Sequence, residues 1–172
     1  MPIHFNDRDV VSEAAGLSSA LIVPCYMCPA VTVAVRDKKP FIQFFRNFLK
    51  SAPFEKYMTT LQSRLKEHGV KTKVFKSIPS HEWFMCMWTS GKRNKLQKCT
   101  EHYEAVIVLG CDSATETVRD VVKSTGCKVI EGMEFAGIMN AKIRFHLPGN
   151  VSFESCKTVP ISRYKQKEGT LE

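Results

Sequence analysis

The sequence predicts one α/β domain with three layers, in which helices cover both faces of a mainly parallel sheet, as in Rossmann-like and flavodoxin-like folds. Short β-branched runs alternate with amphipathic segments over residues 19–130, and this order is typical of parallel βαβ units. Two further strand-like runs, 138–145 and 151–159, flank a His-Leu-Pro-Gly-Asn turn. This turn predicts an antiparallel β-hairpin at the C-terminal end of the domain.

The first half of the chain predicts two strands and two helices. Residues 19–24 form an apolar strand, whereas residues 30–35 are β-branched and fit either a short strand or the first turn of a helix. Apolar side chains at helical spacing predict a packed helix over 41–49 and a second helix over 57–68 that ends before Gly69. Alternating apolar residues and lysines then predict a partly exposed strand.

The second half predicts helices and strands in alternation. The run Ala-Val-Ile-Val-Leu is apolar throughout, as expected for a strand that is buried on both faces. A capping-box pattern of Ser113 and Glu116 predicts the start of the helix after it. The expected segments are a strand at 70–77, a basic surface helix at 91–102, the buried strand at 105–109, a helix at 113–123 and a strand at 127–130.

Composition and charge indicate a globular protein with a basic surface. The chain has 172 residues, of which 44% are hydrophobic, and a formal net charge of +8. We expect one domain over residues 1–160 and a basic, flexible tail over 161–172. The N-terminal sequence has no signal-peptide pattern, and no apolar run reaches the length of a membrane span, so we expect a cytoplasmic protein. Its seven cysteines should then remain reduced, which favours metal ligation or redox work.

The most informative motif is Pro24-Cys25-Tyr26-Met27-Cys28-Pro29, directly after the first strand. Cys86 and Cys111 also lie where an apolar run gives way to polar residues. Because the carboxyl ends of parallel strands share one edge of a sheet, we expect Cys25, Cys28 and Cys111 to meet there, joined by Cys86.

Four thiolates in one place suit a [4Fe–4S] cluster or a tetrahedral zinc ion. We favour the cluster over zinc, because structural zinc sites usually have two close-spaced ligand pairs and this chain has only one. Apolar and sulfur-containing neighbours would limit the access of water to the cofactor, and Ser113 lies at the start of a helix beside it. These candidate cofactor-binding residues are Tyr26, Met27, Trp83, Trp88 and Ser113.

Two other functions fit the same sequence. Cys25 and Cys28 form a candidate redox-active thiol pair, and a helix dipole would stabilise a thiolate at Cys111, giving a thiol- or persulfide-handling enzyme with Cys111 and Asp112 as candidate catalytic residues. The net charge also allows a basic module that binds an acidic protein or nucleic acid, although the chain has no common nucleic-acid-binding motif. For the cluster protein we expect a protein or redox partner. Cys99, Cys127 and Cys156 are expected to be small buried hydrophobic residues.

Overall fold

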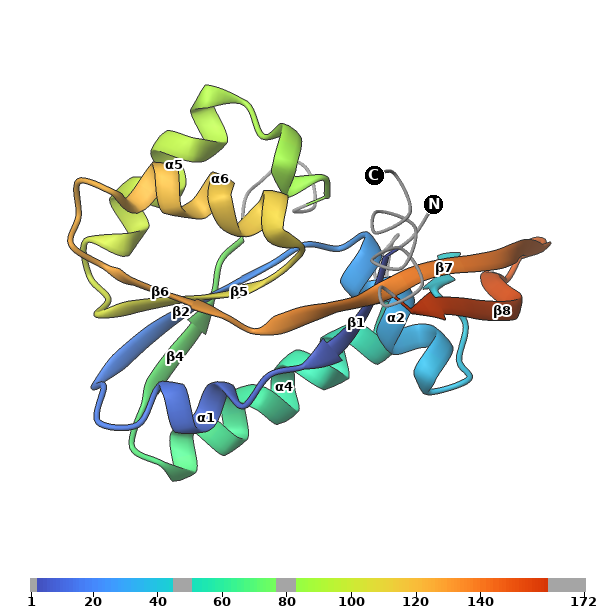
Figure 1. Cartoon of the computed structure of the whole chain (residues 1–172), viewed down its shortest axis with the longest axis horizontal. Coiled ribbons are helices and arrows are strands. Elements are labelled where there is room, and N and C mark those ends of the chain that lie inside the picture. The colour runs from blue at the N-terminus through green and yellow to red at the C-terminus, as the bar shows by residue number, and fades with distance from the viewer. Residues whose placement is uncertain (1–2, 45–50, 77–82, 161–172) are drawn as a thin grey trace, which may run out of the picture.

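A computed structural model gives the structure of residues 3–44, 51–76 and 83–160. The described residues form a mixed α/β structure with two four-stranded sheets, one parallel and one antiparallel (Figure 1). None of the described helices is long and apolar enough to cross a lipid bilayer. The predicted basic tail, 161–172, lies outside the described residues.

The parallel sheet contains the strands that the apolar runs predicted. Its strand order is β4-β2-β5-β6. The strands are β2 (Ser19–Pro24), β4 (Lys71–Val74), β5 (Ala105–Leu109) and β6 (Lys128–Glu131). From β2 the chain forms β4 on one side and then crosses back to form β5 on the other side. The connections from β2 to its two neighbours thus run in opposite directions across the sheet. The carboxyl ends of β2 and β5 are therefore a topological switch point.

Helices lie against both faces of this sheet, and the alternation of side chains along its strands explains why. Ile22 and Ile107 are fully buried against α2 and α4, whereas Leu21 and Val108 are buried against α5 and α6. Figure 1 shows α5 and α6 above the strands and α1 and α4 below them. The helices are α1 (Val10–Glu13), α2 (Cys28–Arg36), α4 (Ala52–Glu67), α5 (Ser90–Thr100) and α6 (Asp112–Val122).

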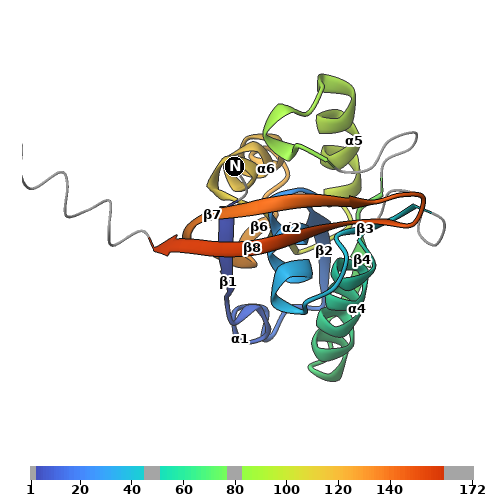
Figure 2. The same cartoon turned by 90° about the vertical axis from the view of Figure 1, so that its right-hand side faces the viewer.

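The C-terminal hairpin is confirmed, but its strands belong to a second sheet instead of extending the parallel one. This antiparallel sheet has the order β1-β7-β8-β3. Its strands are β1 (Ile3–Asp7), β3 (Ile42–Gln43), β7 (Met133–His146) and β8 (Asn150–Pro160). Figure 2 shows β7 and β8 crossing in front of α2 and continuing past it. The helix α2 is therefore enclosed between the two sheets.

The structure decides one open alternative and corrects one expected helix. Residues 30–35, for which the periodicity allowed two structures, lie within α2. The helix expected over 41–49 is wrong at its start, because Ile42 and Gln43 pair with β8 as a strand. Most of its remainder, 45–49, lies outside the described residues. Pairing with a distant strand, which local periodicity does not reveal, decided the structure at Ile42.

Candidate functional site

Three of the four candidate ligands lie at the switch point of the parallel sheet. Cys25 directly follows β2, Cys28 is the first residue of α2, and Cys111 lies between β5 and α6. The backbone N–H of Cys25 donates to the carbonyl oxygen of Leu109 at 2.8 Å, which continues the pairing of β2 with β5 into the loops. Ionisation of Cys28 and of Cys111 disfavours the thiolate of Cys25, so both sulfurs are within electrostatic reach of it. All three cysteines therefore lie at the carboxyl ends of β2 and β5, as the sequence predicts, while their meeting at one point stays a prediction.

Both loops lead directly into a helix, so two helix N-termini begin at the site. Pro29 occupies the first turn of α2, where a missing N–H removes no helical hydrogen bond and the ring sets a helical φ. Cys111 is the N-cap residue of α6. Since Cys111 caps this helix, the predicted capping box of Ser113 and Glu116 is wrong. The N-termini of α2 and α6 therefore lie at the same edge of the parallel sheet.

Burial dominates the ionisation of the thiol pair. The pKa of Cys25 is raised to about 11, mainly by burial and to a smaller extent by the nearby Cys28 and Cys111, against the opposing effect of backbone N–H groups of Met85 and Met27 that donate to its sulfur. Burial also raises the pKa of Cys28, against a hydrogen bond from the backbone N–H of Ile3. Both thiols are therefore neutral at pH 7 in the protein without a bound cation.

Cys86 differs from the other three cysteines. It lies in a short 3-10 helix, η1 (Met85–Met87), and its side chain is exposed, whereas the preceding Met85 is fully buried and contacts Cys25 through its N–H. The backbone of η1 thus borders the site, while the thiol of Cys86 is on the solvent side. In the part of the chain that the structure describes, no three His, Cys, Asp or Glu side chains are arranged to hold a single metal ion.

The predicted apolar neighbours divide between the two faces of the sheet. Tyr26 is buried on the α4 side, where its ring packs edge-on against Phe54 at 5.4 Å and its hydroxyl donates to Glu55 at 2.6 Å. Trp83 packs at the edge of the same cluster. Met27 and the buried Trp88 belong to the α5 side. All four lie in or against the hydrophobic core, and Tyr26 and Met27 do so from within the Cys25–Cys28 loop.

At the start of α6, Asp112 and Ser113 are exposed in the first turn. Both lie beside Cys111 in the chain, as predicted. Of the remaining cysteines, Cys127 is half-buried and its thiol donates to the carbonyl oxygen of Tyr103 at 3.3 Å. Cys99 is also half-buried. Cys156 is exposed on β8, so its expected burial is wrong.

The backbone donors of the site were missed by the sequence analysis. Ile3 and Met85 approach the cysteines through their N–H groups, and Ile3 comes from β1, a strand that the sequence analysis did not predict. Every residue except proline carries such a donor, so no residue type identifies it. Only the position of the backbone in the folded chain could have revealed these contacts.

The raised pKa of Cys25 predicts a loss of stability at high pH in the metal-free protein. The folded state keeps this proton up to about pH 11, whereas the unfolded chain releases it near the ordinary value of 9.0. The free energy of unfolding should therefore fall between these two values, by up to about 3 kcal/mol relative to a Cys25→Ser variant. Urea denaturation of both proteins across this pH range measures the difference, and parallel profiles would contradict it.

The arrangement supports two kinds of chemistry: ligation of a thiophilic metal centre and exchange between thiols and disulfides. Both use thiolates, and both fit an enclosed position next to two helix N-termini. No protein-family model matches the chain, and no curated protein or solved structure is significantly similar to it.

Proposed function

We propose that the protein binds a [4Fe–4S] cluster through Cys25, Cys28 and Cys111 and uses it for electron transfer or cluster-assisted redox chemistry with a protein partner. The observation that carries this proposal is the placement of three thiols from two βα loops at one switch point. Open α/β sheets bind their ligands at this place, outside the carboxyl ends of the strands.

The electrostatics of the site support a cationic occupant. Burial disfavours the thiolates of Cys25 and Cys28, although backbone N–H groups are directed at both sulfurs. A metal centre would supply the positive charge that these buried thiolates need, and its binding would release their protons. Hydrogen bonds to the cysteine sulfurs and apolar surroundings are also the features by which proteins tune the reduction potential of a cluster.

A cluster makes different geometric demands from those of a single zinc ion. Zinc draws all its ligands to about 2.3 Å from one centre, whereas each cysteine of a [4Fe–4S] cluster binds a different iron. The three thiols therefore need only surround a common volume, and they leave one iron for another ligand. Cys86 is the candidate for this position, since its neighbour Met85 contacts Cys25. The cluster would accept one electron from a reduced partner and pass it to an oxidised one.

We also propose that the parallel half of the molecule is a three-layer sandwich of the flavodoxin-like kind. The sheet order β4-β2-β5-β6 corresponds to the order 2-1-3-4 when these strands are numbered along the chain, which is the start of the flavodoxin-like order. Helices lie against both faces of that sheet. In this fold the cofactor binds at the switch point, where the three cysteines lie.

Anaerobic purification followed by iron, zinc and acid-labile sulfide analysis tests the cluster. We expect about four iron and four sulfide per chain and a broad visible absorption that bleaches on reduction. A protein that contains zinc alone, or no metal after reconstitution with iron and sulfide, would overturn the proposal.

A thiol- or persulfide-handling enzyme is the second candidate, favoured by the start of α2 at Cys28 and by the N-cap position of Cys111. In such a reaction the Cys25 and Cys28 thiols would give up two electrons and two protons to form a disulfide, while a substrate disulfide is reduced to two thiols. This function predicts a Cys25–Cys28 disulfide in the oxidised, metal-free protein, detectable by mass spectrometry. Failure to form this disulfide with excess oxidised glutathione would exclude it.

A further inference from the structure

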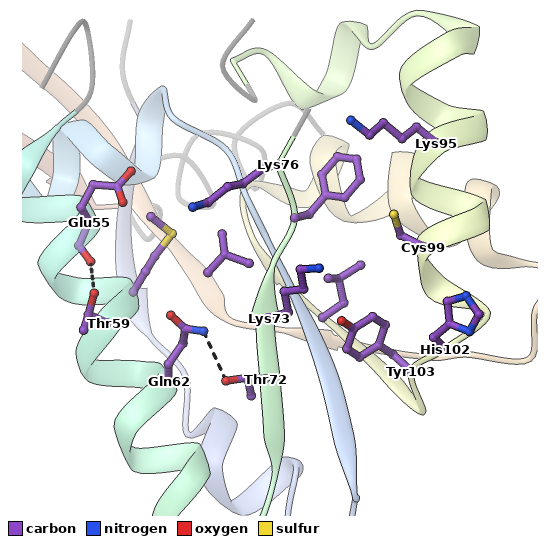
Figure 3. Close-up of a pocket in the computed structure, with 14 residues that line it drawn as sticks. Glu55, Thr59, Gln62, Thr72, Lys73, Lys76, Lys95, Cys99, His102 and Tyr103 are labelled. Carbon is purple, nitrogen blue, oxygen red and sulfur yellow. Dashed lines mark hydrogen bonds between the residues drawn. The ribbon is translucent and has the colours of Figure 1, made fainter. Parts of the chain in front are cut away.

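A groove of about 680 Å³ lies along the open edge of the parallel sheet, at β4. Figure 3 shows Thr59 and Gln62 of α4 on one side of β4, and Lys95 and Cys99 of α5 on the other, together with His102 from the turn after α5. Because α4 and α5 cover opposite faces of the sheet, a groove lined by both helices must lie beyond the edge of β4. Its position is where another strand of the sheet would lie.

The backbone of β4 offers unused hydrogen-bonding groups to this groove. The N–H of Lys71 donates to Ser18 at 2.9 Å and that of Phe75 donates to Ile22 at 2.8 Å, so the odd-numbered residues face β2. In a strand these groups alternate in direction, and the N–H and C=O groups of Thr72 and Val74 therefore face the groove. Among the described residues, β2 is the only strand that pairs with β4. An open edge of this kind is a template for pairing with an extended peptide.

The two walls of the groove differ in charge. On the α5 side lie Lys73, Lys95 and His102, whereas the α4 side carries no charge along β4 and is lined by polar and apolar side chains: Met58, Thr59, Gln62, Thr72 and Val74. Lys76 and Glu55 lie at one end of the groove, next to the carboxyl end of β4. There Glu55 accepts the hydrogen bond from Tyr26. A strand in this groove would direct alternate side chains to a cationic wall and to an uncharged wall that contains Met58.

We propose that the groove binds an extended acidic segment of a partner protein, which adds to β4 as a further strand. Acidic side chains of this segment would face Lys73 and Lys95, and apolar side chains at alternate positions would face Met58. The open backbone edge favours a peptide over nucleic acid, whose phosphates would use the lysines but not the N–H and C=O groups. The chain's own C-terminal segment carries Arg163, Lys165 and Lys167 and lacks the required charge.

This inference does not depend on the cofactor. Tyr26 lies between Cys25 and Cys28 and its hydroxyl bonds to Glu55 in the groove, so a bound partner would lie beside the cysteine site. The groove and the cysteine site are tested separately, since peptide binding can be measured with or without iron in the protein. A partner at this position is well placed to exchange electrons with the proposed cluster.

The probe is a fluorescent peptide of four Glu-Val repeats, with a Lys-Val peptide of the same length as its control. We expect fluorescence anisotropy to show binding of the Glu-Val peptide alone, weakened about tenfold by the double change Lys73→Gln and Lys95→Gln. Lys142→Gln, which removes one positive charge from the exposed hairpin, should not weaken it. Equal binding of the two peptides, or equal loss with Lys142→Gln, would overturn the proposal.

Strand addition has its own signature in the backbone. N-methylation of alternate residues of the peptide should abolish binding in one register, where the N–H groups face β4, and leave it nearly unchanged in the other. Amide hydrogen exchange should slow at Thr72 and Val74 on peptide binding and stay unchanged at Phe75, whose N–H already bonds to β2. Unchanged exchange at Thr72 and Val74, or a single-stranded oligonucleotide that displaces the peptide, would show that the lysines bind anions without strand pairing.

Discussion

Cys111→Ser is expected to abolish cluster binding, so that the anaerobically purified variant is colourless and contains almost no iron or acid-labile sulfide. Cys111 is the only one of the three ligands that follows β5, and without it the two remaining thiols both come from the loop after β2. A pair of ligands from one loop leaves the β5 side of the cluster unbound. Serine keeps the size of the side chain but is a far poorer iron ligand than a thiolate. The measurement is metal and sulfide content together with the visible spectrum.

Cys127→Ser is the matched control for this variant. Cys127 is also half-buried, but its thiol bonds to the carbonyl oxygen of Tyr103 near the start of β6, and a serine hydroxyl can donate in the same way. This control should retain the cluster, and circular dichroism should show that both variants are folded. Wild-type iron content in Cys111→Ser, or equal loss in Cys127→Ser, would contradict the assignment of Cys111 as a ligand.

The parallel sheet could be predicted because its strands carry their signal locally. Residues 105–109 are apolar at every position, which is the pattern of a strand covered on both faces, and all five are fully buried. The placement of Cys25, Cys28 and Cys111 at the carboxyl ends of β2 and β5 followed from the rule that parallel strands end at one edge. These inferences needed only short stretches of sequence and one rule of topology.

Beyond its hairpin, the antiparallel sheet could not be predicted in the same way, and neither could the environment of the thiols. The strand β3 is two residues long and exists because Ile42 pairs with Val151, more than one hundred residues away. Cys86 follows an apolar segment as Cys111 does, yet η1 directs its side chain to solvent. The groove beside β4 depends on which strand lies at the edge, and this order is decided by the whole chain. Long-range pairing is thus the information that one sequence lacks.

Gly110→Ala is expected to weaken both the fold and the cysteine site. A Cβ atom at this position would lie 2.7 Å from the Cβ atom of Ala114 and 3.8 Å from that of Cys25. Ala114 is fully buried in the first turn of α6, so the helix has to move outward, and Cys111 moves with its N-terminus. Overpacking of this kind costs about 1–3 kcal/mol. We expect this loss in the free energy of unfolding of the metal-free protein, and a lower iron content after reconstitution.

Two further variants separate this local effect from a general effect of alanine. Gly91→Ala, in the first turn of α5, places a Cβ atom with no neighbour within 4 Å and should leave both quantities unchanged or slightly stabilise the helix. Ala114→Gly removes the atom that the new methyl group would meet, so adding it to Gly110→Ala should restore iron content even though glycine weakens α6. Such a rescue would show that the spacing between β5 and α6 positions Cys111 for cofactor binding. Wild-type stability and iron content in Gly110→Ala alone would instead show that the site tolerates movement of α6.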